Sequence, residues 1–271
     1  MATNDRQTSG VTVALIGLLP LAVLAILWQW AGTRSSTIHF FFSSPRDVFA
    51  AVITGLRSGN LQTDFLYTAL PTLAGFIIGV TCGTVSGFLI LASRNAAAAL
   101  EWHVLLLGSI PIFAIAPMMI VWFGIGLNMK IAMAILSTFF VALSQSFRGG
   151  RSIPTDLRQL CIANGAGELA QLRTLVLPMS LDWVFASLRL NANLALLGVF
   201  VGEYMASERG LGHSMLQAGA LYRVSDVLAS ALGMILLVVL LDRSLAALER
   251  RRYRLIQWFA VDTRLFRQQP D

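Results

Sequence analysis

Charged side chains are scarce in this sequence. Asp, Glu, Lys and Arg make up 13% of the 271 residues, whereas hydrophobic residues make up 56%. Soluble domains usually carry about 25% charged residues. Lysine is almost missing, with Lys130 as the single example. The composition therefore excludes an ordinary soluble domain and predicts an integral membrane protein.

The sequence also lacks the motifs of the common enzyme and metal sites. Cys82 and Cys161 have no metal-binding spacing. No H-E-x-x-H, G-x-S-x-G or G-x-x-x-x-G-K-[ST] pattern occurs. We therefore expect no catalytic residue, no metal site and no bound cofactor in this chain. The net charge of +6 is not accompanied by a basic–aromatic module, so nucleic-acid binding is not expected.

Long apolar stretches are what the sequence has in place of charge. A helix needs about 20 apolar residues to cross the ~30 Å hydrocarbon layer of a membrane. Six stretches meet or approach this length, at 11–31, 65–92, 104–123, 130–147, 183–202 and 227–247. The sequence thus predicts an all-α polytopic membrane protein with six transmembrane helices. Its parts are an N-terminus (1–10), a transmembrane domain (11–247) with a polar loop (148–182), and a basic tail (248–271).

Arginine gives the expected orientation. If the N-terminus is cytoplasmic, most of the 20 Lys and Arg residues lie on the cytoplasmic side, as the positive-inside bias requires. We therefore expect both termini and the 148–182 loop to be cytoplasmic. The tail mixes arginine with Leu255, Trp258 and Phe259, which suits contact with anionic membrane lipid or a simple stop-transfer anchor.

The second span carries glycine at every fourth position. Gly75, Gly79, Gly83 and Gly87 line one face of the expected helix. A stripe of this kind lets another backbone approach closely. It predicts tight helix packing, either against a neighbour in the same subunit or at a dimer seam or moving surface.

Prolines and amides mark the third and fifth spans. Pro111 and Pro117 predict a bent third helix, which serves either transport or structure alone. Asn191 and Asn193 in the fifth span fit either a pathway lining or a hydrogen-bonded contact between helices. Carboxylates occur at the ends of spans and not near their middles, which argues against a carrier driven by proton or sodium coupling.

A structured polar segment lies in the 148–182 loop, and we call residues 155–178 the elbow. Thr155 and Asp156 are suited to cap its first helix. Asn164 and Gly165 predict the end of that helix, because glycine tolerates a left-handed termination.

The second helix of the elbow is expected from about Gly167. Glu168 would lie at its positively polarised start, and Pro178 is expected to end it. The elbow is more ordered than a simple connection requires. Insertion into a partner protein is one explanation, and a helix lying on the bilayer surface is the alternative.

The segment "NGAGELAQLRTLVLP" resembles the cytoplasmic signature loop of ABC-importer permeases, the binding-protein-dependent inner-membrane components. Gly165 matches the glycine of that loop, and Leu177-Pro178 match its end. The chain departs from the family at Gln159-Leu160-Cys161, where the family has Glu-Ala-Ala. The segments that contain "WFGIG" and "RGLG" are similar to the nitrate/sulfonate/taurine branch of the family.

The resemblance implies a type I ABC importer permease fold in the bacterial cytoplasmic (inner) membrane. It also implies a coupling helix that docks on an ATP-binding cassette subunit. The coupling residues would be Asn164, Gly165, Ala166, Gly167, Glu168, Leu169, Leu172, Arg173 and Pro178. Two copies of the ATP-binding subunit with ATP and Mg, a second permease copy (a homodimer) and a soluble substrate-binding protein would complete the assembly.

The expected function is that of a permease subunit for a small anionic solute such as a sulfonate, taurine or nitrate. ATP hydrolysis is expected in the separate subunit, so the chain itself is not expected to be an enzyme. The pathway lining is expected at Ile112, Met118, Asn191 and Asn193. A secondary carrier and a membrane assembly subunit without a transport pathway are the alternatives.

Overall fold

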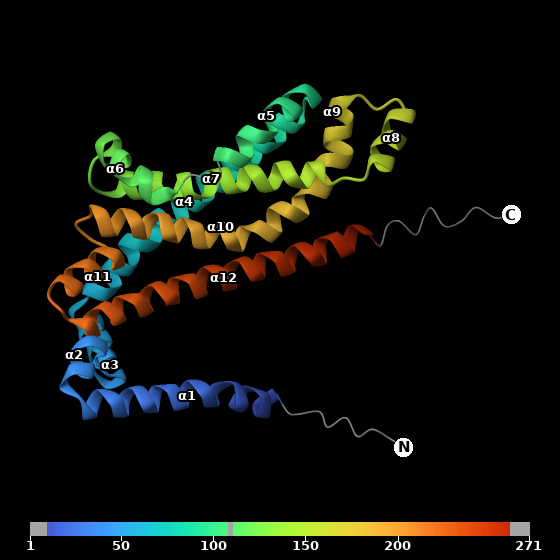
Figure 1. Cartoon of the computed structure of the whole chain (residues 1–271). Coiled ribbons are helices and arrows are strands. Elements are labelled where there is room, and N and C mark those ends of the chain that lie inside the picture. The colour runs from blue at the N-terminus through green and yellow to red at the C-terminus, as the bar shows by residue number, and fades with distance from the viewer. Residues whose placement is uncertain (1–9, 108–110, 261–271) are drawn as a thin grey trace, which may run out of the picture. The chain divides into compact units, whose positions relative to one another are not determined.

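The structure of the chain, a computed structural model, describes residues 10–107 and 111–260, and these residues form helices without any strand. The helices, drawn in Figure 1, fall into two compact units. The first unit comprises Met1–Gln62 and Ser214–Leu232, and the second comprises Thr63–His213 and Gly233–Asp271. The expected polar N-terminus (1–10) and the end of the tail (261–271) lie almost wholly outside the described residues.

The first unit contains α1 (Gly10–Arg34), α2 (Ser36–Phe42) and α3 (Pro45–Ser58). Ser44 caps α3, because its hydroxyl accepts a hydrogen bond from the backbone amide of Asp47 at 3.3 Å. Pro45 follows at the first helical position, where its missing N–H costs nothing. The indole of Trp28 in α1 donates to the carbonyl of Phe42 at 3.2 Å, which fastens α2 to α1.

Four helices of the described chain are long and apolar enough to cross a membrane. They correspond to α4 (Asn60–Leu91), α7 (Leu127–Arg151), α10 (Leu177–Met205) and α12 (Val224–Ala260). These helices match the expected second, fourth, fifth and sixth spans. The helix α1 supplies 25 residues at the expected first span. A total of six spans stays a prediction.

The expected third span is the one that differs. Residues 104–123 do not form one helix, because α5 (Arg94–Leu107) and α6 (Ile112–Phe123) are separate. Pro111 stands before α6 with extended backbone angles (φ −66°, ψ 120°). Proline cannot donate a backbone hydrogen bond and its ring crowds the preceding turn. Pro111 therefore divides the span, whereas Pro117 remains inside α6.

The glycine stripe of α4 packs against α7 of the same chain. A Cβ atom added at Gly75, Gly79, Gly83 or Gly87 would lie within 2.3 Å of an atom of α7. Such distances leave no room for any side chain. Of the expectations for the stripe, the structure shows packing within the subunit, because α7 occupies this face. A role as a moving surface stays a prediction.

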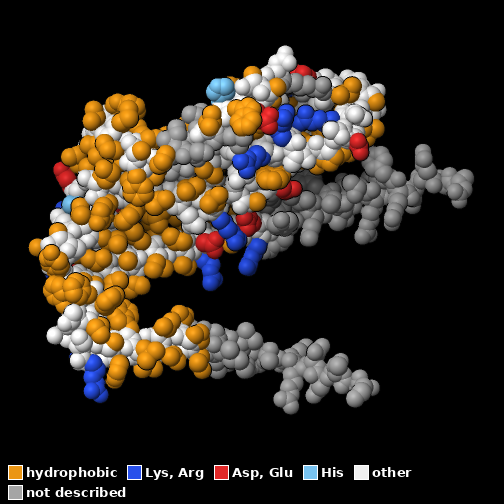
Figure 2. Space-filling view, viewed as in Figure 1, with side chains coloured by type: hydrophobic (Ala, Val, Ile, Leu, Met, Phe, Trp, Pro, Cys, Tyr) orange, Lys and Arg blue, Asp and Glu red, His pale blue; other side chains and the backbone are white. Residues whose placement is uncertain are grey.

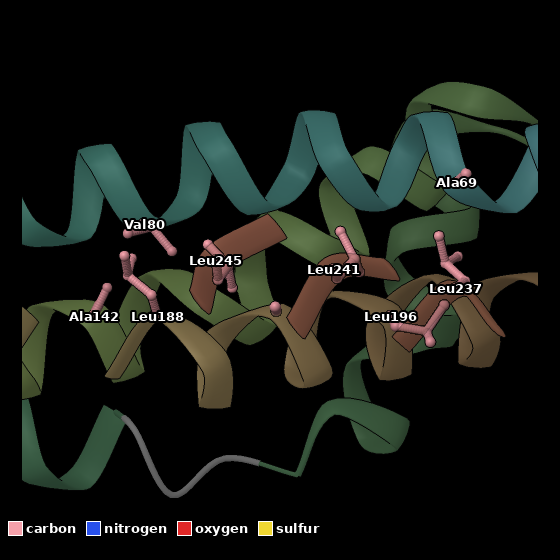
Figure 3. Packing of buried hydrophobic residues seen from close by; sticks show 9 residues of the cluster. Ala69, Val80, Ala142, Leu188, Leu196, Leu237, Leu241 and Leu245 are labelled. Carbon is pink, nitrogen blue, oxygen red and sulfur yellow. The ribbon is translucent and has the colours of Figure 1, made fainter. Parts of the chain in front are cut away.

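Leucines and small residues of α4, α7, α10 and α12 form the largest apolar cluster (Figure 3). Its buried members are Ala69, Val80, Ala142, Leu188, Ala192, Leu196, Leu237, Leu241 and Leu245. Burial of a leucine side chain contributes about 1.5–3 kcal/mol relative to its exposure. The cluster holds α7 and α10, which run side by side in Figure 1, against the two other long helices.

The outer surface of the second unit is strongly apolar. Large hydrophobic side chains such as Leu89, Val121 and Ile235 are more than half exposed. Figure 2 shows hydrophobic side chains over most of the face in view, and charged side chains gathered nearer to the elbow. This distribution suits helices that are surrounded by lipid along their middle portions.

Candidate functional site

The first helix of the elbow is α8 (Thr155–Ala163). Thr155 and Asp156 do not cap it, contrary to expectation, because Pro154 holds the cap position and no side chain bonds there. Thr155 and Asp156 instead occupy the first turn, where a carboxylate still favours the positive end of the helix dipole. With Thr155 as its cap, α8 would begin at Asp156. The observed start at Thr155 is one residue earlier.

The apolar side chains of α8 are uncovered within the described chain. Leu160 is 61% exposed, and Leu157 and Ile162 are also exposed. The helix contains no buried residue among those that the structure describes. A helix that exposes three large apolar side chains on a polar loop has a surface suited to a protein partner.

Asn164 and Gly165 end α8 as predicted. Gly165 has a φ of +77°, a backbone conformation that glycine adopts without strain. The amide of Ala166 donates to the carbonyl of Cys161 at 3.0 Å, and the Asn164 side chain donates to the carbonyl of Leu160 at 2.8 Å. These bonds satisfy carbonyls that the helix end leaves without partners.

The second helix of the elbow starts at Glu168, one residue after the predicted position. It consists of α9 (Glu168–Gln171) and a π-helical turn, η1 (Leu172–Val176). The buried side chain of Gln171 donates to the carbonyl of Ala166 at 2.7 Å. This bond fixes the angle between the turn after α8 and the start of α9.

The prediction that Pro178 ends the second helix is wrong. The chain continues from η1 directly into α10, with Pro178 in the first turn of α10. The amide of Leu177 bonds to the carbonyl of Leu172, five residues earlier. A π-turn widens the helix, so it makes room for a proline ring that would crowd a regular α-helical turn. The second helix of the elbow and the α10 span are therefore one helical rod.

Most of the predicted coupling residues lie on the surface of the elbow. Asn164, Gly165, Gly167, Glu168, Arg173 and Pro178 are exposed, and Ala166 and Leu172 are partly buried. The side chain of Leu169 lies outside the described part of the structure. Their role in coupling stays a prediction.

A cavity of about 430 Å³ lies beside α8. It is lined by Leu91, Ala97, Arg151, Thr155, Arg158, Gln159 and Ile162. Arg158 donates to the carbonyl of Gly150 at 2.8 Å, and Arg151 pairs with Glu101 at 2.8 Å. Gln159 occupies the position at which the ABC-importer signature loop has its glutamate. Its side chain lines this cavity together with the side chains of Arg151 and Arg158.

The predicted pathway residues differ in their surroundings. On α6, Met118 is exposed, and Ile112 packs partly buried beside Met129 and Met133. On α10, Asn191 is fully buried while Asn193 is exposed. The two asparagines are two residues apart, so they point to different faces of the helix.

Asn191 behaves as a buried polar contact within α10. Its amide nitrogen lies 3.0 Å from the carbonyl oxygen and 3.3 Å from the hydroxyl of Ser187. Its Oδ1 atom has no hydrogen-bond partner among the described residues. The structure does not gather the four residues into one site, and their place in a pathway stays a prediction.

Sequence reasoning missed a buried ion pair at the opposite end of α7 and α10 from the elbow. Nζ of Lys130 lies 2.9 Å from Oε1 of Glu203, and the two residues are 2% and 0% exposed. The hydroxyl of Thr68 in α4 lies 2.9 Å from both carboxylate oxygens. The pair is 73 residues apart in the sequence, so spacing gives no sign of it. The single lysine of the chain, at the start of a span, was the available signal.

Comparisons with known proteins agree on one family. A family model described as "Binding-protein-dependent transport system inner membrane component" matches residues 75–254. A probable ABC transporter permease protein of Haemophilus influenzae is 32% identical to the chain, over 79% of the chain and 87% of the relative.

Two further relatives carry more specific names. The riboflavin transport system permease protein RibX of Chloroflexus aurantiacus is 32% identical, over 89% of the chain and 88% of the relative. The putative aliphatic sulfonates transport permease protein SsuC of Escherichia coli is 27% identical, over 86% of the chain and 88% of the relative.

A solved structure shares the fold. The chain is similar to a chain of the inward-facing MetNI methionine ABC transporter, with a TM-score of 0.62 and 20% sequence identity. The match covers 72% of this chain and 97% of that chain.

Proposed function

The chain belongs to the family of binding-protein-dependent transport system inner membrane components, and from this we propose that it forms the translocation pathway of an ATP-driven importer. It is an ABC transporter permease with several membrane-crossing helices.

The solute that we propose is a small anion, in particular a sulfonate, taurine or nitrate. The relative named for aliphatic sulfonates supports this class. A flavin-like solute is the second candidate, because the relative named for riboflavin is more similar, at 32% identity against 27%.

The partner that we propose for the elbow is an ATP-binding subunit. The observation that carries this is the exposed apolar face of α8, which is followed by the left-handed turn at Gly165. Two such subunits, each holding ATP and Mg, would grip the elbows of two permease copies. A soluble binding protein would deliver the solute from outside. Closure of the ATP-binding subunits would then move the elbows and switch the spans between two packings.

The orientation that we propose places the elbow and both termini in the cytoplasm. The helices α7 and α10 then begin and end, respectively, at the outer side, where Lys130 and Glu203 lie. The basic residues of the elbow and the tail support this orientation.

A single charge on the apolar face of α8 tests the proposed partner. We expect Leu160→Glu to reduce co-purification of the ATP-binding subunit by at least about tenfold, since an unpaired charge in an apolar interface costs more than about 1.4 kcal/mol. Solute uptake in proteoliposomes with the binding protein should fall in parallel. The readouts are the subunit ratio on a gel and the rate of ATP-dependent uptake.

Gln159→Glu is the matched control for this substitution. It adds the same charge one residue away, on a side chain that lines the cavity with Arg151 and Arg158. We expect this variant to keep the subunit and the uptake. Size-exclusion chromatography establishes that both variants are folded. Full retention of the ATP-binding subunit by Leu160→Glu would rule out α8 as its docking surface.

A further inference from the structure

The ion pair of Lys130 and Glu203 lies where three long helices meet a loop. Thr68 belongs to α4, Lys130 to the first turn of α7 and Glu203 to the last turn of α10. The loop after α10 leads through Arg209 and Gly210 into α11 (Leu211–Ala220). Contacts with the pair come from all four of these segments, so the cluster joins parts of the chain that are far apart in sequence.

The hydrogen-bonding capacity of the ammonium group is filled within the cluster. Nζ of Lys130 donates to Oε1 of Glu203, to the carbonyl of Arg209 and, at 3.5 Å, to the carbonyl of Tyr67. An ammonium group has three donors. No donor is left for water or for a ligand.

The carboxylate is equally well satisfied. Oε2 of Glu203 accepts from the amide of Gly212 at 2.9 Å, and the Thr68 hydroxyl can donate its one proton to either oxygen. The Thr68 oxygen also accepts from the amide of Leu211 at 2.9 Å. Asp64 accepts from the amide of Gly210 at 3.2 Å. The loop is therefore held by backbone amides that point at acidic and hydroxyl oxygens.

Two glycines let the loop sit directly on the carboxylate. Gly210 has a φ of +126°, and a Cβ atom there would lie 2.0 Å from Oε1 of Glu203. A Cβ atom at Gly212 would lie 2.9 Å from Cβ of Glu203. This contact accounts for the "RGLG" sequence, since a side chain at the first of these glycines would expel the carboxylate.

We infer that the cluster is a permanent tie, and that the ends of α4, α7 and α10 and the loop Arg209–Gly212 move as one body throughout the transport cycle. Separating the helices there would leave a buried ammonium and a buried carboxylate without partners. That state is strongly disfavoured in an apolar setting. Lys130 and Glu203 are thus positioning residues, and the movement that opens the outer side occurs at other contacts. This inference rests on the proposed function and deepens it.

The single lysine of the chain provides a direct test. We propose to treat the wild-type complex with a water-soluble, amine-reactive ester, in proteoliposomes with its ATP-binding subunit and binding protein. Modification of Lys130 is measured by mass spectrometry with and without ATP turnover. We expect no increase during turnover, and full modification after denaturation. A rise that depends on ATP and binding protein would show that the cluster opens, and would overturn the inference.

A cross-link gives a second, independent test. Tyr67 and Arg209 have adjacent side chains, with the guanidinium carbon 5.7 Å from the ring centre. Lys130 donates to both backbone carbonyls, and its Nζ lies 5.9 Å from the centre of the Tyr67 ring, which is a weak contact beside the ion pair. The variant carries Tyr67→Cys and Arg209→Cys, with Cys82→Ser and Cys161→Ser to remove the native thiols. A short bifunctional methanethiosulfonate then joins the two cysteines. The single-cysteine variants, treated in the same way, are the controls.

The cross-linked complex should keep at least about half of its ATPase rate stimulated by binding protein, since a twofold change corresponds to about 0.4 kcal/mol in the barrier. Loss of stimulation on cross-linking, with recovery after reduction, would overturn this inference and leave the proposed function intact. Absence of stimulation before any cross-linking, in the variant and in the wild type, would contradict the proposed function and the inference with it.

Discussion

Glu203 and Lys130 are almost completely removed from water, unlike two exposed ion pairs among the described residues. The pairs Arg151–Glu101 and Arg223–Asp226 have side chains that are at least 39% exposed. Exposed pairs contribute only about 0–1 kcal/mol, because water and salt screen them. A buried pair that loses one partner is far more costly, since the other charge remains in an apolar environment.

Removal of one charge from the buried pair should therefore destabilise the protein strongly. We expect Lys130→Met and Glu203→Gln each to lower the free energy of unfolding by about 3–5 kcal/mol. The double variant contains no charge at this place, and its loss should fall short of the sum by at least about 1 kcal/mol. Denaturation in detergent micelles, followed by circular dichroism, measures these changes.

Arg151→Met and Glu101→Gln provide the matched control on an exposed pair. Each should change the free energy of unfolding by no more than about 1 kcal/mol. Strictly additive losses for Lys130→Met and Glu203→Gln would show that the two side chains do not depend on each other in the folded protein.

Local turn chemistry was predictable from the sequence, and distant pairing was not. The Asn164-Gly165 turn follows from the backbone freedom of glycine, which depends on neighbouring residues alone. The contact between Lys130 and Glu203 depends on how α7 and α10 align, and a single sequence carries no record of that alignment. The role of Asn191 was equally open from the sequence, which fits either a residue that lines a pathway or a hydrogen-bonded contact between helices.

The packing of α4 on α7 shows what small residues do in a membrane helix. The glycines of α4 face Ala134, Thr138, Ala142 and Ser146 of α7, which are also small. Lipid tails are as apolar as leucine, so close van der Waals contact replaces the hydrophobic effect as the main attraction between helices. The four-residue spacing predicted the stripe, and the structure supplied the identity of its partner.

A methyl group on this stripe should therefore be destabilising. A Cβ atom at Gly83 would lie 2.3 Å from the backbone oxygen of Phe139, which cannot rotate away. We expect Gly83→Ala to cost about 1–3 kcal/mol of unfolding free energy, through overpacking. Thermal or chemical denaturation in micelles measures the change.

The neighbouring position supplies the control for the stripe. Cys82 is exposed, so Cys82→Ala should change the unfolding free energy by less than about 0.5 kcal/mol. Equal stability of Gly83→Ala and Cys82→Ala would show that α4 and α7 are less closely packed than the structure has them.

Long helices were predictable from apolar runs, and α4 tolerates Pro71 within its length. The expected span at 65–92 lies inside α4 except for its last residue, and the expected span at 130–147 lies wholly inside α7. Apart from the cap of α8, where Pro154 stands, the errors concern Pro111 and Pro178. One divides a span and the other is absorbed by a π-turn. The sequence shows that a proline perturbs a helix, whereas the local packing decides between a break and a widened turn.

The helices α7 and α10 connect the two polar regions of the second unit. One end of the pair carries the elbow, and the other carries the tie of Lys130 and Glu203. In the proposed orientation the elbow lies in the cytoplasm and the tie lies at the outer side. A displacement of the elbow is then transmitted along two closely packed helices that are fixed together at their far ends.

The two native cysteines test this orientation without any engineered label site. Cys161 lies in α8 of the elbow and is partly exposed, while Cys82 lies within the α4 span. A membrane-impermeant maleimide should label Cys161 in inside-out vesicles and not in right-side-out spheroplasts, as measured by a gel-shift assay. Cys161→Ser should abolish the signal. Labelling of Cys161 from the outside would reverse the proposed orientation.

The π-turn at Leu172–Val176 helps to set the direction in which α8 points around the axis of α10. A π-turn accommodates one residue more than an α-helical turn, and each residue of an α-helix rotates the chain by about 100°. Deletion of a residue that the π-turn does not absorb, such as one in the regular turn of α9, would swing α8 around the rod by roughly that angle. The apolar face of α8 would then be aimed away from its docking direction, although every residue on that face would be unchanged. The spacing before Pro178 is thus as much a part of the coupling surface as its side chains.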